Sequence, residues 1–285
     1  MSELRILLDA LAAREYERAV MITLVKLEGT GYRKAGARMI ITDDGWSCGA
    51  VSGGCIEGVV RDHAKRVIAG DVSETIEVDT TSDTDLLFGS GLGCPGKLQF
   101  LFEPFRRDDC ESRFGALRDA LPPPIALHIF GAGNDAIPMA ALSMTMGWET
   151  SVYDARETFL TRARFAEPVR LVSTHPTPLT LHAHSAAVVT THNYFLDLDW
   201  LRHLLRSNAG YVAIVGSLKR FEMLRGVLRE EGFDVSRLRG PAGLDIGSET
   251  PAEIALSVIA EAKAALAGRD GAPLSRRLHE TTALA

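Results

Sequence analysis

A short apolar run that leads directly into a glycine-rich turn constrains the fold of this chain most. Residues 125–130 are followed at once by Gly131-Ala132-Gly133-Asn134-Asp135-Ala136, and helical periodicity begins there. In a Rossmann-type unit the first glycine makes the turn, and the second lets a pyrophosphate approach the backbone. A small third residue allows the helix to pack closely on the sheet. This spacing therefore predicts a dinucleotide-type strand, turn and helix.

Strands and helices alternate through the rest of this half. We expect strands at 125–130, 149–153, 169–172, 186–191 and 211–215, and a final helix over 251–267. Near-continuous apolar strands such as 186–189 are typical of a parallel sheet that is covered on both faces. The sequence therefore predicts an α/β protein with a C-terminal Rossmann-like parallel sheet domain at 125–268 and a flexible tail at 269–285.

The first half has a different pattern. Helical periodicity covers 3–20, strands are expected at 20–27, 38–42, 46–51, 74–78 and 97–102, and a helix is expected from Cys55. Asp43-Asp44-Gly45 is a turn signal of the hairpin type. We expect a smaller N-terminal α+β domain over 1–104. Residues 105–124, which include three consecutive prolines, are expected to be a linker.

Composition excludes several classes of protein. A net charge of −6 argues against binding to nucleic acid through a general basic field. The N-terminus does not resemble a signal peptide, and no apolar run approaches the length of a membrane span. Four cysteines in 285 residues do not make a disulfide framework. We therefore expect a cytoplasmic protein whose cysteines are free thiols.

Two of these cysteines lie among glycines. Cys55 follows Ser52-Gly53-Gly54 and precedes a predicted helix, whose N-terminus would stabilise a thiolate. Cys94 lies in the segment GSGLGCPG at 89–96, where little surrounds the thiol. An exposed thiolate among backbone amides suits a soft metal ligand or contact with a sulfur-bearing cofactor. The alternative is a small buried residue in a tight turn, which we prefer for Cys48 and Cys110.

Polar residues gather at the ends of the predicted parallel strands. Asp154 lies 23 residues beyond Gly131, close to the spacing of a carboxylate that bonds a ribose 2′-hydroxyl. Arg156 leaves open whether a 2′-phosphate is accepted. His192 is a candidate for ligand contact or proton transfer, or a structural residue. Arg220 and its neighbour Lys219 indicate an anion-binding role at the same edge.

These segments together resemble the XdhC/CoxI family of xanthine dehydrogenase accessory proteins. The residues that carry the resemblance are Gly36-Ala37-Arg38-Met39, Gly53-Gly54-Cys55-Ile56-Glu57, Gly91-Leu92-Gly93-Cys94, Gly131-Ala132-Gly133, Thr191-His192, Gly216-Ser217 with Arg220, and Gly243-Leu244-Asp245-Ile246-Gly247 through Ala255. Pro95 departs from the family pattern, which has a small residue after the loop cysteine.

The resemblance implies a maturation chaperone. Such a protein binds the molybdenum (molybdopterin) cofactor as cargo, helps a cysteine desulfurase to sulfurate it, and delivers it to a xanthine or CO dehydrogenase-type molybdenum hydroxylase. The cofactor-binding candidates are then Cys94 (also the candidate metal ligand), Cys55, Gly53, Gly54, Arg38, Gly131, Gly133, Asp154, His192 and Arg220. Pairing of two copies through the N-terminal domain is a further expectation.

Two other functions stay open. One is an NAD(P)-dependent oxidoreductase that uses Gly131, Gly133 and Asp154 to hold the dinucleotide and His192 as acid or base. The other is a scaffold that bridges a desulfurase and its target through protein contacts alone. No catalytic residue is assigned by the sequence, and an accessory protein is the preferred expectation over a catalyst.

Overall fold

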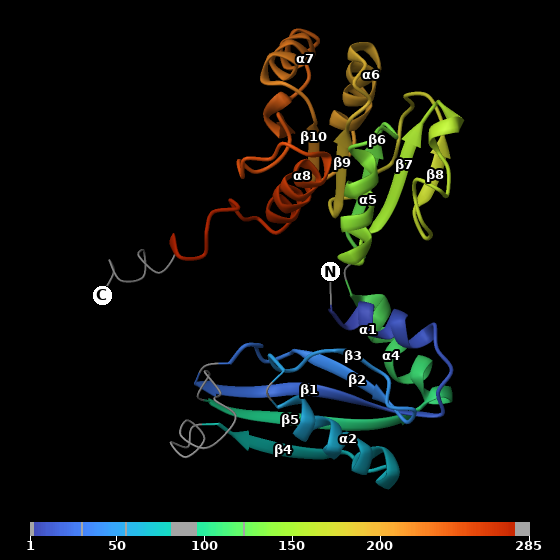
Figure 1. Cartoon of the computed structure of the whole chain (residues 1–285), viewed down its shortest axis with the longest axis vertical. Coiled ribbons are helices and arrows are strands. Elements are labelled where there is room, and N and C mark those ends of the chain that lie inside the picture. The colour runs from blue at the N-terminus through green and yellow to red at the C-terminus, as the bar shows by residue number, and fades with distance from the viewer. Residues whose placement is uncertain (1–2, 30, 55, 81–95, 122, 277–285) are drawn as a thin grey trace. The chain divides into compact units, whose positions relative to one another are not determined.

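The computed structural model describes residues 3–29, 31–54, 56–80, 96–121 and 123–276 (Figure 1). The chain divides into two compact units, Met1–Pro122 and Pro123–Ala285. The division falls within the expected linker, but that linker is shorter than 105–124. Strand β5 runs to Arg106, and helix α4 spans Cys110–Ala120. The α4 residue Phe114 packs edge-on against Phe105 with ring centroids 5.1 Å apart, which holds this segment in the first unit.

The first unit is an antiparallel sheet between helices. Its strand order is β3-β2-β1-β5-β4. The strands are β1 (Arg18–Gly29), β2 (Arg38–Thr42), β3 (Ser47–Gly49), β4 (Glu74–Asp79) and β5 (Gly96–Arg106). The expected hairpin is confirmed, because β2 and β3 pair antiparallel across the Asp43-Asp44-Gly45 turn. The expected helix at 3–20 is wrong beyond Ala12, since Arg18 already pairs with β5.

Alternate residues of this sheet enter two separate clusters. Val20, Ile22 and Phe100 face α2 (Glu57–Gly70) in one cluster. Met21 and Ile40 lie on the opposite face with leucines of α1 (Glu3–Ala12) and with α4. Figure 1 shows α2 on one side of the sheet and α1 with α4 on the other. The period of two along a strand accounts for this separation.

The second unit is a six-stranded parallel sheet. Its spatial order, read from one edge, is β8-β7-β6-β9-β10-β11, which is the 3-2-1-4-5-6 order of a Rossmann fold. The strands are β6 (Ala126–Phe130), β7 (Glu149–Asp154), β8 (Arg170–Ser173), β9 (Ser185–Val189), β10 (Tyr211–Ile214) and β11 (Leu238–Arg239). This confirms the predicted fold class.

Helices cover both faces of the parallel sheet. The helices are α5 (Ala136–Thr145), α6 (Tyr194–Leu205), α7 (Leu218–Glu230) and α8 (Pro251–Leu266). Phe130, Val189 and Ile214 pack with α6 and α7, whereas α5 packs against α8 (Figure 1). Helix α8 begins with a capping box: Thr250 accepts a hydrogen bond from the Glu253 backbone N–H, and the Glu253 side chain accepts one from Thr250 N–H at 2.8 Å.

The strand order places the functional edge of this unit. The order reverses between β6 and β9, so the segments that follow these two strands lead to helices on opposite faces of the sheet and leave a crevice between them. Gly131, Asp154 and the segment after β9 all lie at this edge.

Candidate functional site

The turn after β6 contains two glycines with different structural roles. Gly131 has a φ of +115°, and a Cβ there would lie 2.4 Å from the carbonyl oxygen of Thr190. Gly133 has more room, since its nearest neighbour would be 3.9 Å from a Cβ. Ala136 is fully buried at the start of α5. Gly131 is therefore required by backbone packing, whereas Gly133 leaves the turn open to a ligand.

Asp154 ends β7 beside this turn, and its carboxylate is fully engaged. Oδ2 accepts hydrogen bonds from the Ala132 backbone N–H at 2.8 Å and from Arg156 Nη2 at 2.7 Å. Oδ1 accepts from both the backbone N–H and Nε of Arg156 at 2.9 Å. Burial alone would raise the pKa of Asp154, but the Arg156 and Ala132 hydrogen bonds outweigh it and lower the pKa. Asp154 is thus an ionised carboxylate at the predicted place.

His192 lies in the segment that follows β9 and pairs with an acidic residue at the start of α5. Its backbone has a φ of +56°, which is unusual for a residue other than glycine. Its Nε2 lies 2.9 Å from Asp135 Oδ2 and 3.3 Å from Thr190 Oγ1. Because a carboxylate at a helix N-terminus repels a second anion, Asp135 disfavours a diphosphate in this turn.

Arg220 binds a buried carboxylate. Its guanidinium forms an ion pair with Asp197, whose side chain is completely buried. Thr191 donates a further hydrogen bond to Asp197. The expected anion-binding role of Arg220 is therefore not supported by its contacts, because its charge is already paired. The pair instead joins α6 to α7 behind the sheet edge.

A cavity of about 170 Å³ opens where the carboxyl ends of these strands meet. Gly131 and Asp154, two of the candidates named from the sequence, line it. Arg156 also lines it, together with apolar side chains of Tyr153, Leu196 and Trp200. Gly133, His192 and Arg220 are not among its lining residues. The aromatic lining could have been predicted from the strand pattern only with knowledge of how α6 packs on the sheet.

The glycine loop of the first unit is held by Glu57 from the first turn of α2. The Ser52 backbone N–H donates to Glu57 Oε1 at 3.2 Å, and the Gly54 N–H donates to Ser52 Oγ at 3.2 Å. The Glu57 carboxylate thus folds back onto the loop that precedes its helix. A Cβ on Gly53 would lie 3.0 Å from the ring of Tyr32. Tyr32 itself is 76% exposed.

The remaining candidates of the first unit fall elsewhere. Cys55 and Cys94 lie outside the described residues. Arg38 begins β2 and points to the side of the sheet that carries α1, since Met39 next to it faces α2. The neighbouring Arg33 is paired with Glu3. The positive charge of this neighbour of Arg38 is therefore already paired.

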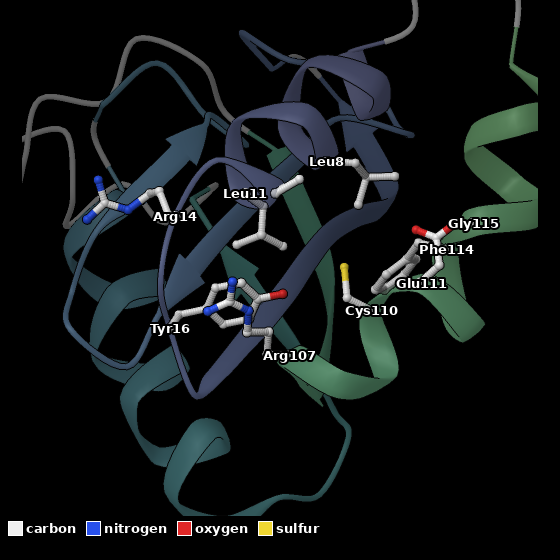
Figure 2. A pocket seen from close by; sticks show the side chains of 10 residues that line it. Leu8, Leu11, Arg14, Tyr16, Arg107, Cys110, Glu111, Phe114 and Gly115 are labelled. Atoms are coloured by element: carbon white, nitrogen blue, oxygen red, sulfur yellow. The ribbon is translucent and has the colours of Figure 1, made fainter.

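A second cavity, of about 160 Å³, lies between α1 and α4 (Figure 2). Leu8, Leu11 and Phe114 form its apolar lining, and Tyr16 and Cys110 supply a phenol and a thiol. Burial raises the pKa of Tyr16, and its hydrogen bond with Cys110 raises it further. Cys110, expected to be a small buried residue, is half-buried and lines this cavity. Spacing could not indicate this, because Tyr16 is distant in sequence.

The part of the chain that the structure describes offers neither a metal cluster nor a membrane span. Its residues include no group of three or more His, Cys, Asp or Glu side chains suited to a metal ion. Nor does any helix in the same residues have the length and apolar character needed to cross a membrane.

Comparison with known proteins covers both units. Residues 12–79 match the model of the XdhC and CoxI family, and residues 127–262 match that of the XdhC Rossmann domain. A Bacillus subtilis protein named as a probable xanthine dehydrogenase subunit is 30% identical over 92% of this chain and 97% of its own length.

The chain belongs to the XdhC and CoxI family.

Two further relatives of this XdhC/CoxI protein span both units. The molybdenum cofactor insertion chaperone PaoD of Escherichia coli is 23% identical over 85% of this chain and 82% of its own. The crystal structure of a xanthine dehydrogenase from Bacillus halodurans has a TM-score of 0.82 and 25% identity, and covers 95% of this chain and 97% of its own. The resemblance seen in the sequence motifs is therefore confirmed.

Proposed function

We propose that this XdhC/CoxI protein carries the molybdenum cofactor and inserts it into a molybdenum hydroxylase of the xanthine or CO dehydrogenase type. The observation that carries the proposal is the similarity to PaoD, a protein named for molybdenum cofactor insertion, over 85% of the chain. A match of this extent includes residues of both units, so it is not a likeness of the Rossmann fold alone. We further propose that a cysteine desulfurase sulfurates the cargo while it is bound.

The Gly53–Gly54 loop supports a cargo site in the first unit. Both glycines are exposed, so the backbone there is open to close approach by an anionic group. The Tyr32 ring lies on Gly53 and is itself largely exposed, which offers a surface on which a flat heterocycle such as a pterin can stack. Glu57 holds the loop through Ser52, so the loop keeps its shape.

We propose that Cys94 or Cys55 binds the molybdenum end of the cargo. Thiolates are soft ligands, and these two cysteines are the ones that lie among glycines. Arg38 is then a candidate partner for the cofactor's phosphate. Its position on the α1 side of the sheet makes it a less direct participant than the loop.

The test is retention of released cofactor under anaerobic conditions. The protein is incubated with molybdenum cofactor and passed through gel filtration, and molybdenum and pterin are assayed in the protein peak. We expect both to elute with the wild type and to be lost in Cys94→Ala. Cys48→Ala serves as the matched control, because Cys48 packs against the α1 cluster and should leave retention unchanged. If both Cys94→Ala and Cys55→Ala retain the cofactor, the proposal that a thiolate binds the molybdenum is wrong.

The stacking role has its own pair of variants. Tyr32→Ala removes the ring over Gly53 and should lower pterin retention, whereas Tyr32→Phe keeps the ring and should retain the wild-type level. Equal retention by the two variants would show that the ring does not contact the cargo. Because Tyr32 is 76% exposed, neither variant should affect folding.

The partner proposals are tested separately. Pull-down of the hydroxylase and the desulfurase by cofactor-loaded protein is expected, and light scattering would detect a homodimer. Co-purification of both enzymes with a protein that never retains cofactor would favour the scaffold alternative.

An NAD(P)-dependent oxidoreductase is the second candidate. The Rossmann strand order and the cavity at its reversal favour nucleotide binding. The oxidoreductase would also need an acid or base that moves a proton during hydride transfer. His192 is the candidate for that role, and its Nε2 is hydrogen-bonded to Asp135. Loss of dinucleotide binding in Gly133→Val, together with turnover of a reduced cofactor by the wild type, would support this candidate.

A further inference from the structure

We propose that the cavity beside Asp154 binds an adenine nucleotide whose ribose carries a phosphate on its 2′-oxygen. This site lies in the second unit and is proposed independently of cofactor carriage by the first. The cavity is smaller than the roughly 300 to 1,000 Å³ of a typical complete ligand site, so it suits one end of a nucleotide.

The state of Asp154 argues against an unmodified ribose. In a dinucleotide site, the carboxylate after the second strand accepts a hydrogen bond from the ribose 2′-hydroxyl. A carboxylate has about four lone-pair positions. Asp154 already accepts four hydrogen bonds, three from Arg156 and one from the Ala132 backbone. A ribose hydroxyl would therefore find no acceptor there unless Arg156 moved away.

The same contacts leave Arg156 ready to bind an anion. Its Nε–H and one Nη2–H are used on Asp154, so three of the five guanidinium N–H groups stay available. The side chain is 52% exposed, and the guanidinium carbon lies 4.2 Å from the centroid of the Phe159 ring. Because Asp154 and Phe159 hold its plane, the remaining donors are pre-oriented at the cavity wall. A fixed guanidinium of this kind suits bidentate recognition of phosphate.

A second cation adds to the positive charge. Arg164 also lies over Phe159, at 5.1 Å, and its Nη2 donates to the Ala132 carbonyl at 2.9 Å. Its Nε is buried and has no hydrogen-bond partner among the described residues. In the described part of the chain it forms no ion pair. Arg164 therefore offers a positive charge that Asp154 does not neutralise.

Glu157 opposes this field from the same loop. Its carboxylate accepts a hydrogen bond from Ser173 at 3.2 Å. The net preference for phosphate thus depends on Arg156 and Arg164 outweighing Glu157. This makes Glu157 a useful position for a test, since its side chain is exposed and the four hydrogen bonds to Asp154 come from Arg156 and Ala132.

The apolar part of the cavity suits the base. Tyr153, Leu196 and Trp200 line it, and Trp200 packs against Phe130 with ring centroids 4.4 Å apart. Asp154 and Arg156 form the wall at the end of β7, where the ribose lies in a Rossmann site. The base and the 2′-phosphate can therefore be bound without a diphosphate near Asp135.

The test compares three nucleotides by isothermal titration calorimetry on the full chain. The probes are 2′,5′-ADP, 5′-AMP and 3′,5′-ADP. We expect 2′,5′-ADP to bind roughly 10- to 100-fold tighter than 5′-AMP, which is the range for a charge-assisted hydrogen-bond pair. Equal affinities for 2′,5′-ADP and 5′-AMP, or no binding of either at millimolar concentration, would overturn the proposal. Equal affinity for 3′,5′-ADP would overturn the assignment to the 2′-position.

Arg156→Ala gives the sharper result. It removes the phosphate ligand and the two guanidinium hydrogen bonds to Asp154, which opens one acceptor position on each carboxylate oxygen. The preference should therefore disappear while 5′-AMP binds as well as before or better. Arg162→Ala is the matched control, because Arg162 is an arginine of the same region that pairs with Glu167. An unchanged preference in Arg156→Ala would contradict the proposal.

Glu157→Gln keeps the test decisive should Arg156→Ala fail to fold. It removes a negative charge at an exposed position, and it should tighten 2′,5′-ADP several-fold while leaving 5′-AMP less affected. A parallel change in both nucleotides would mean that the 2′-phosphate is not near this loop.

Discussion

The guanidinium of Arg220 and the carboxylate of Asp197 form an ion pair in which only one partner reaches water. The Asp197 side chain is completely buried, whereas that of Arg220 is 24% exposed. Burial raises the pKa of Asp197, although Thr191 and Arg220 both favour its ionised form. For the ionised carboxylate, the unfavourable effect of burial is therefore larger than the favourable effect of the contacts with Thr191 and Arg220.

This imbalance predicts unequal effects of removing the two partners. Arg220→Leu leaves a buried carboxylate without its cation and should lower the free energy of unfolding by about 3 to 5 kcal/mol. Asp197→Asn leaves Arg220 with access to water and should cost less than about 2 kcal/mol. Urea unfolding of both variants measures the difference. Equal losses would show that the pair is a symmetric stabilising contact.

Gly131 and Gly133 should respond unequally to an added methyl group. Gly131→Ala places a Cβ 2.4 Å from the Thr190 carbonyl oxygen in a backbone with positive φ, and should destabilise the protein by at least about 2 kcal/mol. Gly133→Ala meets nothing closer than 3.9 Å and should change stability by less than about 1 kcal/mol. Thermal unfolding followed by circular dichroism checks the pair, and a fully stable Gly131→Ala would contradict the packing described here.

His128 should make the second unit sensitive to acid. Burial chiefly, with contributions from His182 and Arg170, lowers the pKa of His128 to about 4. A histidine whose pKa is lowered on folding contributes stability that is present above about pH 6.5 and is lost as pH falls toward 4. The loss should reach roughly 2 to 3 kcal/mol.

The measurement is urea unfolding at pH 7.5 and pH 4.5 for wild type and His128→Gln. The variant should lose less stability between the two pH values than the wild type does. His175→Gln is the control, because His175 is exposed. A wild-type loss that His128→Gln does not reduce would assign the acid sensitivity to other groups.

Glu261 should be the residue that holds the segment before α8 against the sheet. Its Oε2 accepts hydrogen bonds from the Tyr211 hydroxyl at 2.6 Å and from the Gly243 backbone N–H at 2.8 Å. Tyr211→Phe removes one neutral donor and should cost about 1 kcal/mol. Glu261→Ala leaves both donors without their acceptor and should lower the free energy of unfolding by about 2 to 4 kcal/mol. Hydrogen exchange at Gly243 should accelerate in Glu261→Ala and much less in Tyr211→Phe.

The sequence predicts the Rossmann unit well because its signals are local. Gly131, Gly133 and Ala136 lie within six residues, directly after an apolar strand and at the start of a helix. Asp154 also lies where the spacing puts it, at the end of β7. Helix α4 has the sequence character of a linker, because charged residues and prolines surround it. Its stabilising contact, between Phe105 and Phe114, depends on packing that no local pattern shows.

The side-chain contacts within the candidate site cannot be predicted from local sequence signals. That Arg156 fills the acceptor positions of Asp154 depends on side-chain conformation and on the Phe159 ring beneath the guanidinium. The pairing of His192 with Asp135 joins residues 57 positions apart. The ion pair between Arg220 and Asp197 could not be predicted from the sequence either. The two residues meet only because α6 packs on α7.

Trp200 gives the cavity of the second unit an intrinsic optical signal. The chain has three tryptophans, and Trp200 is the one that lines this cavity. Its indole packs against Phe130, so a ligand beside it changes the surroundings of a rigid chromophore. Trp46 belongs to the first unit, under the guanidinium of Arg14 at 4.8 Å. With Trp46 and Trp148 replaced by phenylalanine, the emission spectrum would therefore report occupancy of a single site, without any attached dye.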